Sequence, residues 1–197
     1  NRNAQYLLSL VNQLIDLRKI DTQNLTLNYS QFNFSKFLNT TITDFSNLMK
    51  ERNISFEKIY RLKSDHIYSD KENLHKILFN LLSNAIKHTP DKGKITLHAN
   101  QFIDKSNKLM QFISVTNSGS IIAPDEIDKI FNRFYRIPEQ NKYTNYGQSS
   151  TGIGLHIVKE LINLLDGTIK VKSSEKEGVS FRSVSYTHLR AHETVLD

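Results

Sequence analysis

The stretch KENLHKILFNLLSNAIKHTP (71–90) decides the fold of this chain. Its apolar residues recur every three or four positions, which predicts a helix over about 71–88 with one buried face. A second face of this helix carries polar side chains, those of Asn80, Asn84, Lys87 and His88. Asparagine is a mediocre helix former, so this face is either tolerated solvated surface or an oxygen ligand for a hard cation beside a phosphate-binding lysine. The segment alone leaves both interpretations open.

Two segments containing glycine follow this helix. VTNSGSII (115–122) is typical of a strand that ends in a turn. STGIGLHIVKELINLL (150–165) places Gly152 and Gly154 at the start of a helix, where backbone N–H groups can approach a phosphate. The G-x4-G-K-[ST] pattern of a P-loop is absent. Each segment taken alone is equally typical of an ordinary turn or of a loop-to-helix junction.

The other elements predict an α+β fold, with helices layered on one face of a mixed sheet. A helix is expected over 5–20, another from a Ser35 cap to about Asn53, and a short one from Pro124 to Phe131. Strands are expected at about 25–29, 54–60, 66–70, 94–103, 108–116, 168–173 and 178–183. The polar stretch 137–150 is long for a loop in a compact domain, which indicates a functional loop or disorder.

The first helix carries leucines at alternating spacings of three and four, namely Leu7, Leu10, Leu14 and Leu17. Such a short seam is typical of a helical hairpin or of a dimer contact. An ordinary amphipathic helix that packs on its own domain gives the same pattern. The sequence does not choose between these interpretations.

Composition excludes several classes of protein. The 197 residues include no cysteine, which rules out disulfides and cysteine-ligated zinc. The net charge is +6, but Lys and Arg are scattered and form no basic helix, so we expect no contact with nucleic acid. No apolar run is long enough to span a bilayer.

The two ends of the chain carry expectations of their own. The final residues VSYTHLRAHETVLD (184–197) resemble one reading frame of a common sequencing adapter, and we expect them to be an artefact. His188 and His192 are set aside with them. We therefore expect the natural sequence to continue past Ser183, and the initial Asn1 to mark a cut.

Taken in order, four segments resemble the motifs of sensor histidine kinases, in the gyrase, Hsp90, histidine kinase and MutL superfamily of ATP-binding domains. They are NLLSNAIKHTP (80–90) for the N box, VTNSGSII (115–122) and STGIGLHIVKELINLLDGTI (150–169) for the two glycine boxes, and FNRFYR (131–136) for the F box. The helix 6–21 is similar to the second helix of the family's dimerisation hairpin. The short segment 137–150 and the sequence Thr-Gly-Ile-Gly-Leu (151–155) resemble those of hybrid kinases of the Bacteroidetes.

The resemblance implies a division into three parts. Residues 1–22 would be the end of the dimerisation hairpin, 23–183 the catalytic ATP-binding domain of Bergerat type, a two-layer α+β sandwich, and 184–197 the artefact. The implied parent is a homodimer, anchored in the inner membrane with this domain in the cytoplasm, whose partner is a response regulator receiver domain. The implied activity is transfer of the ATP γ-phosphate to a histidine of the dimerisation domain.

The resemblance also implies ATP and Mg²⁺ as ligands, with Asn84 as the Mg²⁺ ligand. Asn117 stands where the family carries an adenine-binding aspartate, and Ile121 stands where it carries a glycine; both departures place nucleotide affinity in question. Residues 137–150 match the lid over the triphosphate. The implied ATP-binding residues are Asn80, Asn84, Lys87, His88, Asn117, Gly119, Ile122, Arg133, Arg136, Thr151, Gly152, Gly154 and Leu155. For Arg133 and Arg136, phosphate contact and docking on the dimerisation helices are both open.

No catalytic nucleophile is expected in this sequence. The histidines before the tail, His66, His75, His88, His98 and His156, all lack the H-E-x-x-[TN]-P context of a phosphoacceptor. We therefore expect this fragment to bind Mg-ATP without phosphorylating itself. Two alternatives remain: a degenerate nucleotide-sensing module, favoured by Asn117 and Ile121, and another ATPase or serine kinase of the superfamily, which the leucine seam and the F box argue against.

Overall fold

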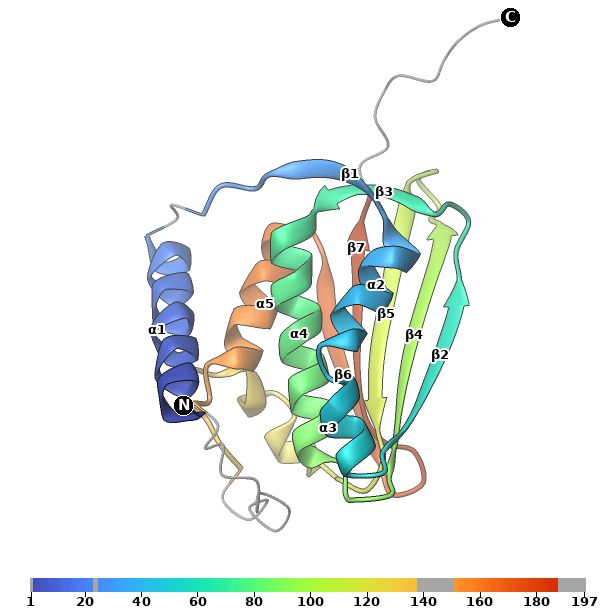
Figure 1. Ribbon diagram of the computed structural model, residues 1–197. Helices are drawn as coiled ribbons and strands as arrows, with labels where there is room; N and C mark the ends of the chain where they lie inside the picture. The colour runs from blue at the N-terminus through green and yellow to red at the C-terminus, as the bar shows by residue number, and fades with distance from the viewer. Residues whose placement is uncertain (1, 23–24, 138–150, 188–197) are drawn as a thin grey trace, which may run out of the picture.

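In the computed structural model, helices cover one face of a five-stranded mixed sheet (Figure 1). The structure describes residues 2–22, 25–137 and 151–187. The strand order is β2-β4-β5-β7-β6, in which only β2 and β4 are parallel. The strands are β2 (Ser55–Arg61), β4 (Lys94–Ile103), β5 (Leu109–Asn117), β6 (Thr168–Ser174) and β7 (Gly178–Tyr186). The predicted α+β class is confirmed.

The helical layer consists of α2 (Phe34–Thr43), α3 (Ser46–Glu51), α4 (Lys71–His88) and α5 (Gly154–Leu164). The apolar stripe of α4 is fully buried between its neighbours and the sheet, with Ile77, Leu78, Leu81 and Leu82 almost without solvent contact. Facing it from the sheet are Ile95, Leu97, Ile113 and Val115. Burial of this stripe fixes which face of α4 remains for other contacts.

A short ribbon of β1 (Tyr29–Asn33) and β3 (His66–Asp70) closes one end of the domain. The expected strand at 25–29 was therefore wrong in position. The antiparallel register sets Tyr29 against Asp70 and Phe32 against Ile67, so the strand begins where pairing with β3 begins. Leu25 and Leu27 instead pack their side chains against the core outside any strand.

The single helix expected from Ser35 to Asn53 is two helices, interrupted at Asp44 and Phe45. Three threonine hydroxyls at the end of α2 bond back to carbonyls four residues earlier, a habit that weakens a helix. The cap of α2 is Asn33, whose side chain accepts from the Lys36 amide at 2.8 Å, and not Ser35. The helix expected after Pro124 is a pair of 3-10 turns, Pro124–Glu126 and Lys129–Phe131.

The first helix, α1 (Arg2–Asp21), lies beside α5 at the edge of the helical layer (Figure 1). Of its leucine seam, Leu17 is buried and Leu10 half-buried, whereas Leu7 and Leu14 are exposed. Leu8, Val11 and Ile15 are exposed as well. One side of α1 thus packs on its own domain while an apolar side stays open.

Strand β7 continues through Val184 to Tyr186, paired with β5 on one side and reaching β6 at Val184. The tail expected to be an artefact thus begins inside a strand, and its residues 188–197, including both tail histidines, lie outside the described residues. No helix in the described ranges has the length and apolarity needed to cross a membrane.

Candidate functional site

The segments singled out in the sequence meet at one end of the domain. The C-terminal end of α4, the end of β5 and the beginning of α5 all point to the lower end of the molecule in Figure 1. On α4, the side chains of Asn80, Asn84, Lys87 and His88 are half-buried along the predicted polar face. The lid residues 138–150 lie outside the described residues. The site is therefore built from α4, β5 and the turn before α5.

The turn before α5 packs closely around its two glycines. Gly152 has φ +69°, and a Cβ there would lie 2.6 Å from the backbone of Phe134. A Cβ at Gly154 would lie 2.7 Å from Oδ1 of Asn80, so any larger residue there would have to displace the Asn80 side chain. The Asn80 amide is itself held, since its Nδ2 donates to the Lys76 carbonyl at 2.8 Å. Asn80 thus sets the distance between the two helices.

The beginning of α5 offers backbone donors to the site. Its N-cap residue, Ile153, makes no side-chain capping hydrogen bond. The hydroxyl of Thr151 accepts from the Ile153 amide at 3.2 Å and donates to Oε1 of Gln13 on α1 at 2.9 Å. Leu155, in the first turn, is half-buried and packs its side chain against the core. Free N–H groups at the positive end of an 11-residue helix form a suitable anion site.

A turn after β5 forms the second wall. Asn117 is only 2% exposed, and its Nδ2 donates to Oγ of Ser120 at 2.7 Å. Gly119 has φ +82°, and a Cβ there would meet Pro90 at 2.4 Å, which ties this turn to the end of α4. The buried Ile122 donates its amide to Oγ of Ser173 on β6. Ile121, which the resemblance placed at a glycine position, is 49% exposed.

Positive charge gathers at the end of α4. Burial, and then the nearby charge of Arg136, lower the pKa of the Lys87 amine. Burial, and then the charge of Lys87, lower the pKa of His88 to about 4, so its imidazole is neutral at physiological pH. Two cations held close together repel each other, and an anion between them would relieve that repulsion.

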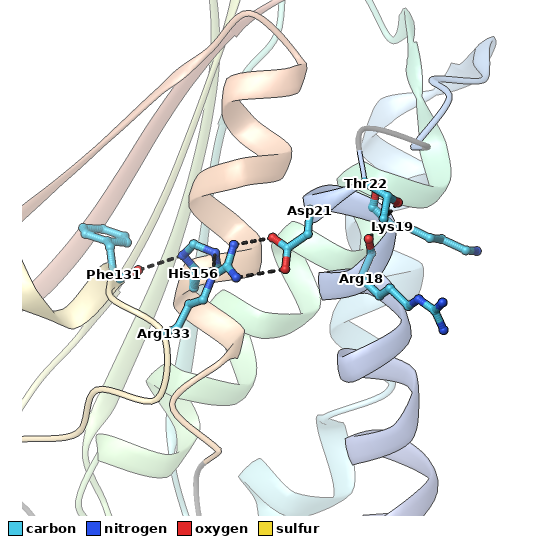
Figure 2. A network of polar contacts seen from close by, with 7 residues as sticks. All are labelled: Arg18, Lys19, Asp21, Thr22, Phe131, Arg133 and His156. Atoms are coloured by element: carbon cyan, nitrogen blue, oxygen red, sulfur yellow. Dashed lines mark hydrogen bonds and ion pairs between the residues drawn. The ribbon is translucent and has the colours of Figure 1, made fainter.

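Arg133 contacts Asp21 on α1 (Figure 2). Its guanidinium bonds both carboxylate oxygens of Asp21, and its Nε donates to Nε2 of His156 at 2.9 Å. The other imidazole nitrogen of His156 lies 3.1 Å from the Phe131 carbonyl, so the ring is fixed between the F-box segment and Arg133. Arg133 therefore contacts the first helix in this structure, and its contact with phosphate stays a prediction.

The sequence analysis did not identify Arg52, which binds backbone carbonyls at the end of α4. Arg52 is 4% exposed and donates to the carbonyls of Ile86 and Thr89, both at 2.6 Å, and to Asp91 at 2.8 Å. These bonds tie down the last turn of α4, which carries Lys87. No sequence pattern marks Arg52, because its role depends on a hydrogen bond to Ile86, 34 residues later in the chain.

The described residues hold no cluster of three or more His, Cys, Asp or Glu side chains that could bind a metal ion. Amide oxygens and oxygens of a bound ligand are the groups that could hold a divalent cation at the end of α4. Asn84 is the half-buried amide on the α4 face between Asn80 and Lys87. This donor set fits Mg²⁺, which keeps several waters and takes few protein ligands.

Comparison with known proteins gives a consistent assignment. Residues 69–188 match the family described as histidine kinase-, DNA gyrase B-, and HSP90-like ATPase. "Histidine kinase P4" of Formosa agariphila is 34% identical over 201 residues, covering 99% of this chain and 14% of that protein. "Sensor histidine kinase TmoS" of Ectopseudomonas mendocina is 34% identical over 183 residues, covering 92% of this chain and 18% of the relative. The chain thus spans less than a fifth of the length of these two relatives.

Solved structures agree on the fold. The catalytic domain of histidine kinase ThkA has a TM-score of 0.66 at 24% identity, covering 81% of this chain and 96% of the ThkA domain. Full-length ShkA in complex with AMPPNP has a TM-score of 0.80 at 24% identity, covering 95% of this chain and 37% of ShkA. ThkA has also been crystallised with the response regulator protein TrrA; that structure has a TM-score of 0.67 at 23% identity, covering 93% of this chain and 51% of that one.

Proposed function

The chain belongs to the histidine kinase-, DNA gyrase B- and HSP90-like ATPase family, and we propose that its domain transfers the γ-phosphoryl group of ATP to a histidine on the dimerisation domain of its parent protein. It is the ATP-binding catalytic domain of a two-component histidine kinase. We propose the division 1–22 hairpin, 23–183 catalytic domain and 184–197 artefact on the basis of the sequence resemblance.

The observation that carries the proposal is the close approach of the beginning of α5 to the polar face of α4, where a Cβ at Gly154 would lie 2.7 Å from Oδ1 of Asn80. Lys87 lies on the same face, near the charge of Arg136. Two cations whose repulsion, added to burial, lowers the pKa of Lys87 form a poor arrangement for stability alone. The same arrangement suits a triphosphate, because phosphoryl transfer depends on positioning and on neutralising charge. Free N–H groups at the α5 terminus support the same ligand.

We assign roles to the site residues accordingly. Asn84 would hold Mg²⁺, which would supply charge neutralisation between the phosphates. Lys87, Arg136 and the turn from Thr151 to Gly154 would bind phosphate oxygens. Oδ1 of Asn117 would accept from the 6-amino group of adenine, while Gly119 and Ile122 shape that wall. Asn80, His88 and Leu155 would position these groups, and Arg133 would fix the domain on α1.

The phosphoacceptor would lie on a hairpin helix outside this sequence, so the fragment alone would bind Mg-ATP without phosphorylating itself. The exposed apolar side of α1 supports homodimerisation of the parent through that hairpin. A response regulator receiver domain is the proposed partner, by analogy with ThkA and TrrA. We place the domain in the cytoplasm of a parent anchored in the inner membrane, by family analogy alone.

Isothermal titration of the chain with a non-hydrolysable ATP analogue, with and without Mg²⁺, tests the nucleotide site. We expect Mg²⁺-dependent binding that Asn84→Ala weakens by about tenfold or more, because one amide ligand is lost from a shared ion. Asn163→Ala, an exposed asparagine on α5, is the matched control and should leave affinity unchanged. Equal affinity with and without Mg²⁺ would contradict the role of Asn84.

A second candidate function is nucleotide sensing without transfer, and Asn117 favours it because a neutral acceptor is weaker than a carboxylate by about 1 kcal/mol. An assay of phosphoryl transfer to a separate hairpin distinguishes the two functions. The chain is mixed with labelled ATP and a separately purified dimerisation hairpin of the parent. Phosphohistidine on the hairpin supports the kinase; nucleotide binding without any transfer supports the sensor.

A further inference from the structure

Strand β6 (Thr168–Ser174) forms one edge of the five-stranded sheet. It pairs with β7 along its whole length. On its other side, no backbone hydrogen bond joins β6 to any segment that the structure describes. The N–H and C=O groups on that side are therefore available to a further strand.

The side chains of β6 alternate between the two faces of the sheet. Ile169 and Val171 are half-buried and pack against the hydrophobic core, so they face the helices. Lys170 and Lys172 are exposed and lie on the face opposite to the helices (Figure 1). A strand added at this edge would therefore meet apolar side chains on one face and two ammonium groups on the other.

Positive charge on this second face has no partner of opposite sign. Lys170 lies directly opposite Arg182 of β7 in the register, and Lys172 lies opposite Ser180. Nε of Arg182 donates to Oγ of Ser180 at 3.1 Å, so its guanidinium leans toward the row of Lys172. Like charges opposite each other in a sheet repel. Within the described part of the chain, no salt bridge involves Lys170, Lys172 or Arg182.

The acidic residues beside β6 in the chain do not neutralise this charge. Asp166 precedes the strand, and Glu175 and Glu177 are exposed in the turn after it. Among the described residues, none of the three takes part in a salt bridge. The lysines also oppose pairing of two copies of this chain through β6, because lysines of one copy would lie beside those of the other. Charge complementarity thus favours an acidic strand at this edge.

We propose that the free edge of β6 binds an extended acidic polypeptide segment, which adds a strand to the sheet. Main-chain hydrogen bonds with β6 give the segment its affinity, and carboxylates at alternate positions face Lys170 and Lys172. Apolar residues between those carboxylates lie beside Ile169 and Val171. The partner is therefore a protein segment in which acidic and apolar residues alternate.

Isothermal titration of the 197-residue chain with the peptide Gly-Glu-Val-Glu-Val-Glu-Gly tests this proposal. We expect saturable binding with a dissociation constant below about 1 mM. The same peptide with lysine in place of glutamate should not bind, because like charges would then lie opposite each other.

Reversing the two charges on β6 should reverse this preference. Lys170→Glu with Lys172→Glu should weaken binding of the acidic peptide by at least about tenfold and allow the lysine peptide to bind. Lys50→Glu with Lys63→Glu changes the net charge equally at exposed positions away from β6 and should leave both affinities nearly unchanged. Thermal melting shows whether each variant is folded.

N-methylated peptides distinguish strand pairing from charge attraction, and they decide the matter on the unaltered chain if the charge-reversed variant does not fold. Alternate amides of an extended strand point to opposite sides, so methyl groups on one alternate set block pairing with β6 and methyl groups on the other set do not. We expect one methylated peptide to lose binding and the other to keep it. Equal affinity of the two, whether both bind or neither does, overturns the inference.

Two further results would overturn it. One is binding of the acidic peptide that the folded charge-reversed variant leaves unchanged. The other is binding of a single-stranded oligonucleotide that depends on Lys170 and Lys172 while the acidic peptide does not bind, which would identify a nucleic-acid site. Both results leave the proposed function standing, because neither lysine belongs to the proposed nucleotide site.

Discussion

The two ends of α4 differ in how their polar groups are paired. At the N-terminal end, both carboxylate oxygens of the buried Asp70 accept hydrogen bonds, from the Asn73 amide and side chain and from the Asn28 amide. At the C-terminal end, Lys87 lies near another cation and His88 is kept neutral. No salt bridge to Lys87 is found among the described residues.

This difference indicates that the N-terminal end of α4 contributes more to the stability of the domain than the C-terminal end. One end satisfies local rules of helix capping, with an acidic residue at the positive end of the helix. The other end also has basic residues where the helix dipole favours them, but it holds Lys87 near a second cation in the place where a ligand is proposed to bind. Arg52 binds the backbone carbonyls of that turn. Substitutions at the two ends should therefore affect different measured quantities.

The largest effect is expected at the capped end. Asp70→Ala leaves three donors without their acceptor and should lower the free energy of unfolding by about 3 kcal/mol. Asp70→Asn keeps one acceptor and should lose less. Urea denaturation measures both, and titration of the ATP analogue should show unchanged affinity. Loss of affinity equal to that of Asn84→Ala would show that the two ends are not independent.

The next effect concerns acid stability at the other end. The pKa of His88 is about 4 in the folded protein, below its ordinary value of 6.5. The unfolded chain therefore binds this proton first, so stability is complete above pH 6.5 and falls as the pH drops toward 4. The loss should be on the order of 2 kcal/mol, discounted for the partial exposure of the ring.

Urea denaturation across this pH range checks the role of His88. His88→Gln should flatten the acid dependence, because the substituted side chain does not titrate. His66→Gln, at an exposed position on β3, is the control and should leave the dependence intact. A similar acid dependence in His88→Gln and the unaltered chain would assign it to other groups.

A smaller effect of opposite sign is expected at Lys87. Because its charged form is disfavoured by burial and by Arg136, Lys87→Gln should raise the free energy of unfolding without nucleotide by up to about 1 kcal/mol. The same substitution should weaken binding of the ATP analogue by about tenfold, since a phosphate contact is lost. If Lys87→Gln instead lowered the free energy of unfolding of the nucleotide-free protein, it would contradict the inference that the charge of Lys87 destabilises this end of α4.

The smallest effect is expected at the ion pair between Arg133 and Asp21, which is partly exposed. Asp21→Asn should change the global free energy of unfolding by less than about 0.5 kcal/mol. Amide hydrogen exchange in α1 should nevertheless increase, because α1 is tied to the domain by few contacts. Unchanged exchange in α1 would show that its other contacts hold this helix without the ion pair.

The sequence predicted best those elements whose pattern is local. The helix ending at His88 and the strands on either side of residues 104–107 were placed within a residue or two, because their periodicity comes from burial on one face. The strand at 25–29 and the long second helix failed, since pairing with β3 and back-bonding threonine hydroxyls decided those boundaries.

For the candidate site, the sequence supplied the residues but little of their geometry. The polar face of α4 could be read from spacing, and the resemblance added Asn117 and the glycine turn. The anchoring of Arg133 on Asp21 could not be read, because 112 residues separate the two. Arg52 and Ser120 were missed for a related reason: each acts through a hydrogen bond that only the folded chain creates.

Helix α1 touches the glycine turn directly, through Gln13 and Thr151, and reaches α4 through Asp16 and Lys76, whose side chains lie 2.9 Å apart. Thermodynamic linkage gives these contacts a consequence. If a rotation of α1 that breaks them changes nucleotide affinity by some factor, then nucleotide binding must bias the position of α1 by the same factor. An input that moves this helix and a nucleotide that fills the site are, in that case, two effectors of one equilibrium.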